Sequence, residues 1–132
     1  MTGFAADVAR FAKKANASVD AVVRKVTFDL FFEVVQRTPV DTGRLKANWQ
    51  ASQNVPVRGT LTSTDKDGNT TMVAIAGAIG GAGSVTYLAN NLPYAHRIEF
   101  DGWSRQAPAG MVRVSMARVQ RLLSAAARQH KV

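Results

Sequence analysis

The chain has 132 residues, a formal net charge of +8, 46% hydrophobic residues, 20% charged residues and no cysteine. This length fits one domain with one core, and the balance of apolar and charged residues excludes wholesale disorder. The lack of cysteine excludes disulfides, thiolate nucleophiles and thiolate metal sites. We therefore expect a single domain over residues 1–132.

The apolar stretches of the sequence are too short or too interrupted for membrane targeting. Asp7, Arg10 and Lys13 break up the N-terminal region, which does not read as a signal peptide. The longest uncharged run, residues 70–97 up to Arg97, is diluted by glycine, asparagine and threonine, and it offers no stretch of about 18 apolar residues. We expect no membrane partner.

Residues 2–37 are predicted to form one long amphipathic helix. Over positions 4–30, apolar residues ending with Val19, Val22, Val26 and Leu30 recur at steps of three and four, the spacing of one helical face. The pattern becomes apolar almost all round over residues 28–35, so this end is expected to be the most buried. Such a helix would span about 50 Å, longer than a domain of this size is wide, and part of it is expected to project toward another subunit.

Residues 38–49, TPVDTGRLKANW, predict a corner after that helix. Pro39 lacks an amide donor and ends the helix. A short helix is expected to follow, with Asp41 or Thr42 as its N-cap, and to seat Trp49 in the core. The residues expected to shape this corner and two later turns are Pro39, Asp41, Thr42, Gly43, Trp49, Pro93, Tyr94 and Pro108.

Residues 50–107 predict a small, mostly antiparallel sheet with connecting loops. Residues 50–61 alternate apolar and polar side chains as a strand does, and Pro56 confines that strand to an edge or a bulge. Residues 84–89 are rich in strand formers. The remaining segments are a loop at 62–71, a helix or strand at 72–79 that we take as a helix, and a strand or helical turn at 94–100.

Residues 108–130 predict a C-terminal helix with one apolar side and one basic side. Its apolar residues, from Val112 to Ala126, fall within an arc of about 80°, and its arginines lie opposite. No acidic residue occurs from Arg105 to the end of the chain. The expected fold class is α+β, with a long N-terminal helix and a basic C-terminal helix packed on the small sheet.

Three patterns approach chemical sites but lack essential members. The Asp-Thr-Gly tripeptide at 41–43 matches aspartic proteases, but Arg44 follows directly, and a cation beside the carboxylate opposes the proton sharing those enzymes need. His96 and His130 are the only histidines, and their spacing does not suit zinc. The glycines at 77–83 lack the Lys-Ser/Thr of a phosphate loop. We expect no enzyme, no cofactor and no metal ion, with the protease as the least favoured alternative.

The arginine face of the last helix has two interpretations that the sequence leaves open. It could follow nucleic-acid phosphates with little specificity and a steep salt dependence. Alternatively, it could be a solvated face or a contact with an acidic neighbouring protein. The charged residues expected at subunit contacts are Arg44, Arg97, Glu99, Arg113, Arg118, Arg121 and Arg128.

Three stretches, in this order, resemble one known family. They are the corner at 38–49, the segment YLANNLPYAHRIEFDGWSRQAPAGMVRVS at 87–115, and the arginine-bearing helix that follows. Over most of residues 37–125 the chain is similar to the tail-completion or neck proteins of long-tailed bacteriophages, also known as head-tail joining or minor tail proteins. Asp101 departs from the Glu-aromatic-Gly run usual in relatives, which affects the expected local turn.

The resemblance implies a structural virion protein that assembles as a ring between the head connector and the tail tube. It implies partners among the connector or head-closure, tail-terminator and tail-tube proteins, contact with DNA in the lumen, and assembly in the host bacterial cytoplasm. Ring subunits of this kind can be monomeric in solution, because small interfaces associate weakly alone. The alternative function is a basic, non-specific DNA-binding protein.

Overall fold

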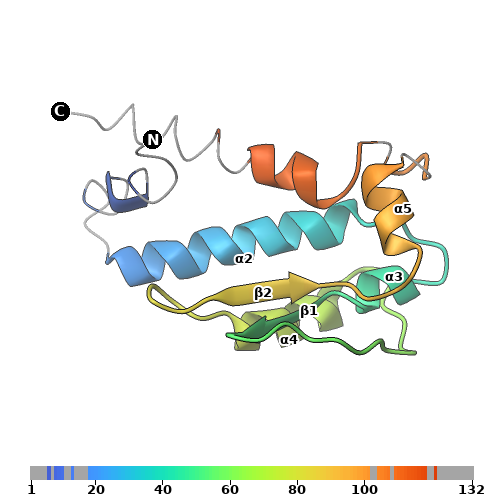
Figure 1. Ribbon diagram of the computed structural model, residues 1–132, viewed down its shortest axis with the longest axis horizontal. Coiled ribbons are helices and arrows are strands. Elements are labelled where there is room, and N and C mark those ends of the chain that lie inside the picture. The colour runs from blue at the N-terminus through green and yellow to red at the C-terminus, as the bar shows by residue number, and fades with distance from the viewer. Residues whose placement is uncertain are drawn as a thin grey trace.

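The chain folds into helices packed around a two-stranded antiparallel sheet, which confirms the α+β class (Figure 1). The computed structural model describes residues 6, 8–10, 13, 18–101, 104–107, 109–118 and 121. Its elements are α2 (Val19–Arg37), α3 (Arg44–Ala47), β1 (Gln50–Gln53), α4 (Asn69–Ala78), β2 (Thr86–Ala89) and α5 (Ala95–Phe100). Residues 112–118, here called the C-terminal helical segment, are also helical. That residues 1–132 form one domain stays a prediction.

α2 begins at Val19, so the single helix predicted over residues 2–37 is wrong. Ser18 has extended backbone angles, φ −71° and ψ 151°, and its hydroxyl accepts a hydrogen bond from the amide of Ala21 at 3.1 Å. A serine N-cap followed by Asp20 in the first turn is a typical helix start. The helix ends at Arg37, before Pro39, as expected. Within the described ranges, no helix combines the length and hydropathy needed to cross a bilayer.

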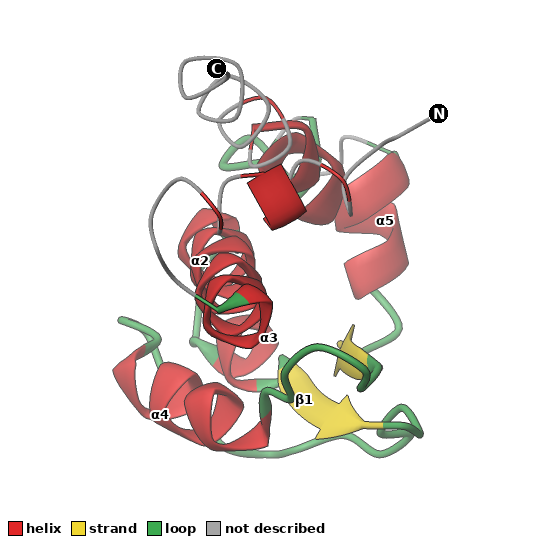
Figure 2. Ribbon diagram, turned by 90° about the vertical axis from the view of Figure 1, so that its left-hand side faces the viewer, coloured by secondary structure: helices red, strands yellow, loops and turns green. Residues whose placement is uncertain are grey.

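The buried face of α2 also differs from the predicted apolar stripe. Phe31, Val34 and Val35 enter the core, whereas Val19, a member of that stripe, is 45% exposed. Figure 2 shows α4 and β1 lying together beneath α2, and these elements select which side of the helix is covered. The later part of α2 is the most buried, as expected, but not on all sides.

Trp49 lies in the core and closes the corner at 38–49. Its side chain is 7% exposed, which confirms its expected burial. Its Nε1 donates a hydrogen bond to the Thr38 hydroxyl at 2.8 Å, and that hydroxyl donates to the Val34 carbonyl at 2.7 Å. The indole thus packs against apolar side chains while its one polar atom is satisfied, and the C-terminal end of α2 is tied to the residue that precedes β1.

β1 and β2 are each shorter than the strands predicted over 50–61 and 84–89. Gln50 pairs with Ala89 and Gln53 with Thr86. β1 ends because Asn54 adopts a positive φ of 69° and the Val55 amide donates back to the Gln53 carbonyl at 2.8 Å. The chain therefore turns away from the sheet at Asn54, two residues before Pro56 would have interrupted the ladder.

α4 confirms a helix at 72–79 and is capped by an acidic side chain from the preceding loop. The Asp65 carboxylate accepts hydrogen bonds from the amide and the hydroxyl of Thr71, both at 2.7 Å, and from the amide of Gly68 at 3.2 Å. Burial alone would raise the pKa of Asp65, but these hydrogen bonds outweigh it and lower the pKa. The segment predicted as strand or helical turn at 94–100 is also helical, as α5.

Replacing Trp49 should separate the contribution of its packing from that of its hydrogen bond. Trp49→Ala is expected to lower the free energy of unfolding by about 3–5 kcal/mol, because it leaves a cavity in the core. Trp49→Phe keeps most of the ring volume but leaves the Thr38 hydroxyl with one partner fewer, and should cost less than the alanine variant. Urea unfolding of the three proteins measures both values; an alanine variant within 1 kcal/mol of the native chain, below the cavity range, would contradict the burial.

Candidate interaction surface

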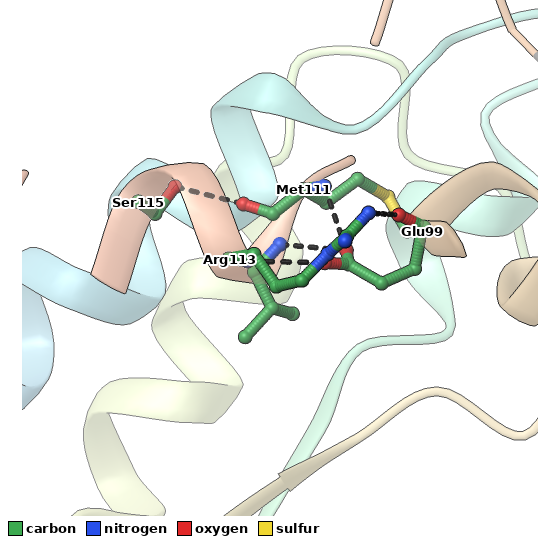
Figure 3. Close-up of polar contacts among 5 residues, drawn as sticks. Glu99, Met111, Arg113 and Ser115 are labelled. Carbon is green, nitrogen blue, oxygen red and sulfur yellow. Dashed lines mark hydrogen bonds and ion pairs between the residues drawn. The ribbon is translucent and has the colours of Figure 1, made fainter. Parts of the chain in front are cut away.

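Glu99, on α5, caps the first turn of the C-terminal helical segment (Figure 3). Its Oε1 accepts hydrogen bonds from the amides of Met111 and Val112 at 2.7 and 2.8 Å, and its Oε2 accepts one from the amide of Arg113 at 3.0 Å. The first amides of a helix have no partner within the helix, so one carboxylate satisfies three of them. Glu99 was predicted at a subunit contact, but it is only 7% exposed and acts inside the subunit.

Arg113 and Gly110 complete the contact between Glu99 of α5 and the C-terminal helical segment, here called the Glu99 joint. The Arg113 Nε lies 3.1 Å from Glu99 Oε2, and its terminal nitrogen also donates to the backbone carbonyl of Glu99. Gly110 has a φ of +93°, and a Cβ there would lie 2.6 Å from the Glu99 carbonyl oxygen. Since Gly110 is left-handed and Met111 is not helical, the predicted helix start at residue 108 is wrong. Pro108 itself lies outside the described residues.

The groups around the Glu99 joint favour the ionised form of the Glu99 carboxylate. Burial of the side chain would raise its pKa, but the amides of Val112, Arg113 and Met111 and the Arg113 guanidinium together lower it below the ordinary value of 4.5. The negative charge also faces the positive end of the helix dipole. The contact is therefore fully formed at neutral pH.

Phe100, next to Glu99, packs with His96 and Arg113 in an exposed cluster, here called the Phe100 cluster. Phe100 is 55% exposed as a residue. The His96 ring centroid lies 4.8 Å from the centroid of its ring, and the Arg113 guanidinium carbon lies 4.9 Å from the same centroid. An arginine held against an aromatic face is a cation–π contact, and aromatic and arginine side chains are enriched at protein interfaces. α5 thus presents Glu99 inward and Phe100 outward.

The other predicted contact arginines divide into two groups. Arg118 pairs with Glu33 of α2 at 3.1 Å, and Arg44 Nε donates to the Leu61 carbonyl at 3.1 Å, so both make contacts within the chain. Arg97 and Arg121 are exposed on α5 and in the C-terminal region. Arg128 lies outside the described residues. Pairing with the chain's own acids therefore accounts for two of the arginines assigned to the basic face, Arg113 and Arg118.

The Asp-Thr-Gly turn at 41–43 is shaped by its glycine, and its aspartate is not the cap. Gly43 is the N-cap residue of α3 with φ 91°, and the Thr42 hydroxyl accepts a hydrogen bond from the Arg44 amide at 3.2 Å. A Cβ on Gly43 would lie 2.9 Å from the Asp65 amide nitrogen. Because Gly43 holds the N-cap position, the predicted N-cap at Asp41 or Thr42 is wrong, and Asp41 is exposed.

Two of the residues expected to shape later turns lie just before α5. Pro93 is exposed, and Tyr94 is partly buried against the core.

Within the described ranges, no group of three His, Asp or Glu side chains is placed to hold a metal ion.

The helices also carry an exposed aromatic pair that the sequence patterns assigned to the interior. Phe28 and Phe32 of α2 are 36% and 45% exposed, and their rings stack with centroids 6.4 Å apart. They lie one turn apart on the same side of the helix. With Phe100, they are the described surface aromatics best suited to contact another protein.

Comparison with protein families decides the class of this chain. Residues 3–100 match the family model described as "Bacteriophage HK97-gp10, putative tail-component". The chain belongs to this family. No curated protein and no solved structure matches it. This HK97-gp10-like chain is thus a structural component of a bacteriophage tail, which confirms the resemblance found in the sequence. The matched region includes Glu99 and ends with α5 at residue 100, so the C-terminal helical segment lies outside it.

The charge of Glu99 should make the stability of this tail component dependent on pH. Because the folded-state pKa is lowered, the stabilisation is present at neutral pH and is lost as the pH falls below about 4.5. Glu99→Gln is expected to cost about 2 kcal/mol at pH 7, and this difference from the native chain should shrink on acidification. Chemical unfolding at several pH values measures it, with Asp29→Asn, at an exposed ion pair, as the control. A difference that stays constant down to pH 3 would contradict the role of the charge, because that pH lies below the ordinary value.

The pairing of Arg118 with Glu33 predicts unequal effects at two arginines of the C-terminal region. Arg118→Glu removes a half-exposed ion pair and places two carboxylates together, and should cost about 1 kcal/mol. Arg121→Glu, at an exposed position, should cost less. Thermal unfolding of the two variants checks the order, and equal midpoints would show that the Glu33 contact does not stabilise the fold.

Proposed function

We propose that this tail component is a neck subunit that joins or completes the tail, assembling as a ring between the head connector and the tail tube. The observation that carries the proposal is the aromatic surface on two helices: Phe28 and Phe32 on α2, and Phe100 on α5. Exposed aromatic groups of this size, in a chain from a family of tail components, support contacts with neighbouring proteins.

The partners that suit this surface are copies of the same chain and the proteins on either side of the neck. A ring needs two different surfaces on each subunit, because a head-to-tail contact repeats until the rotation closes. The net charge of +8 favours acidic surfaces on the connector, head-closure, tail-terminator or tail-tube proteins. The same charge disfavours association between free copies, which agrees with a monomer that assembles only on a template.

A second candidate function, non-specific DNA binding, is supported by the same charge and by exposed arginines such as Arg105 and Arg121. It is the weaker candidate, because Arg113 and Arg118 are paired with Glu99 and Glu33. Binding of duplex DNA in the micromolar range at about 0.15 M salt, weakening steeply as salt rises, would favour it. Lack of binding there would remove it.

Electron microscopy of particles assembled without this chain tests the neck function. We expect full heads and free tails that do not join, and joined particles when the native chain is restored. Phe28→Gln combined with Phe32→Gln should fold but restore joining poorly, because both rings are exposed in the subunit. Lys25→Gln, at an exposed ion pair of the same helix, is the control. Intact, joined particles without the chain would sink the proposal.

A further inference from the structure

The outer edge of β2, on the side away from β1, presents backbone groups that the described structure leaves unbonded. The Asn54 amide donates to the Val85 carbonyl at 2.8 Å, in the same register that pairs Gln53 with Thr86. In an antiparallel ladder, every second residue points its backbone N–H and C=O groups toward the partner strand. These groups of residues 85, 87 and 89 therefore point toward β1. Thr86 and Leu88 therefore turn their N–H and C=O groups outward, and no described residue bonds to them.

This edge also lacks the features that usually prevent strand pairing. Residues 84–89, Ser-Val-Thr-Tyr-Leu-Ala, contain no charge and no proline. Val85 is 55% exposed and Tyr87 is 37% exposed. Natural edge strands are commonly blunted by lysine, proline or a bulge, and an edge without them is a template for another strand. We take the edge of β2 as one half of an interface.

A second strand-like edge lies in the segment 57–61. The carbonyls of Val57 and Gly59 accept hydrogen bonds from the Asn91 side chain at 2.9 and 3.0 Å. Both backbone groups of Leu61 bond to the Asn48 side chain, at 2.7 Å for the amide and 3.0 Å for the carbonyl. Alternate residues thus face the subunit, which is the period of an extended strand.

The residues between them face outward. Arg58 and Thr60 are exposed, and no described residue bonds to their backbone N–H or C=O groups. They are two residues apart, as Thr86 and Leu88 are, so the two edges present unbonded backbone groups at the same spacing. The amide side chains that hold 57–61 in place keep it extended without a neighbouring strand.

The segment 57–61 and the free edge of β2 lie beyond opposite edges of the two-stranded sheet. A hollow of about 290 Å³ is lined by Val57 and Leu61 together with residues of α4. β1 contributes Gln50 and Ala51 to its lining, and β2 contributes none of the lining residues. The segment 57–61 therefore belongs to the β1 side, and the free edge of β2 is the opposite one. In Figure 1 the coil that follows β1 runs back beneath it, and β2 lies above.

We propose that neighbouring subunits pair as β-strands, with Arg58 and Thr60 of one copy bonded to Thr86 and Leu88 of the next. This inference rests on the proposed ring function and supplies the head-to-tail contact that a ring requires. The pairing involves few hydrogen bonds and little area, so free copies associate weakly and the contact forms on a template. The extended segment is also ordered in advance, which lowers the entropic cost of pairing.

Cysteine crosslinking in joined particles tests this contact, because the native chain has no cysteine. A chain that carries both Thr60→Cys and Tyr87→Cys, treated with a short bismaleimide, should give a ladder of covalent oligomers that ends at the ring. Chains with either substitution alone should remain monomeric. The pair Thr60→Cys and Val73→Cys, with the second thiol on the exposed α4 position, is the matched control and should give no ladder.

Each outcome has a defined meaning. Dimers from Tyr87→Cys alone would show two β2 strands pairing about a two-fold axis, and would overturn the head-to-tail contact. Monomers from the double variant in joined particles would also overturn it, while leaving the neck function intact. If the double variant is not incorporated, Arg58→Cys with Val85→Cys places thiols on the same two edges and is scored in the same way. Joined particles in the absence of the chain would instead refute the neck function.

Discussion

The carboxylate of Glu99 is the constraint on which the C-terminal part of the fold depends. It is held on α5, yet it satisfies the first amides of a different helix and pairs with Arg113. A buried anion is stable only where donors surround it, and here the donors are helix amides that need an acceptor. Gly110 is required because any side chain there would meet Glu99. The direction of the C-terminal helical segment follows from this one contact.

A second set of polar contacts fixes the corner between α2 and the sheet. Thr38 joins the end of α2 to Trp49, Asn48 joins α3 to the chain at Leu61, and Asp65 joins the turn at Gly43 to α4. The Thr38 and Asn48 side chains bond to groups eleven and thirteen residues away, and Asp65 reaches Gly43 through its backbone amide. All three residues are buried or partly buried. The long connection between β1 and α4 is therefore held by specific bonds, although it belongs to no helix or strand.

The same bonds decide which surfaces remain for assembly. Arg113 and Arg118 are engaged with acids of the chain, so the basic face is less free than the sequence indicates. What the subunit exposes is a pair of stacked rings on α2, the Phe100 cluster, and backbone groups at two edges to which no described residue bonds. These are surfaces that other proteins can cover, in keeping with a structural tail component.

The sequence by itself determined the α+β class, the phage tail family, the end of α2 before Pro39 and the burial of Trp49, because each follows from local pattern or motif. It left the element at 72–79 open between helix and strand, and the structure decided for the helix α4. Only the tertiary structure decided where α2 starts, which face of it is covered, and where Glu99 and the arginines point. Periodicity cannot distinguish a covered face from an exposed one in a helix that is apolar nearly all round. It also cannot show that an acid will meet amides far along the chain, because that meeting depends on how the helices pack. The structure also decided where β1 ends. The alternating pattern continued to residue 61, but the positive φ of Asn54 turns the chain away from β2 before Pro56.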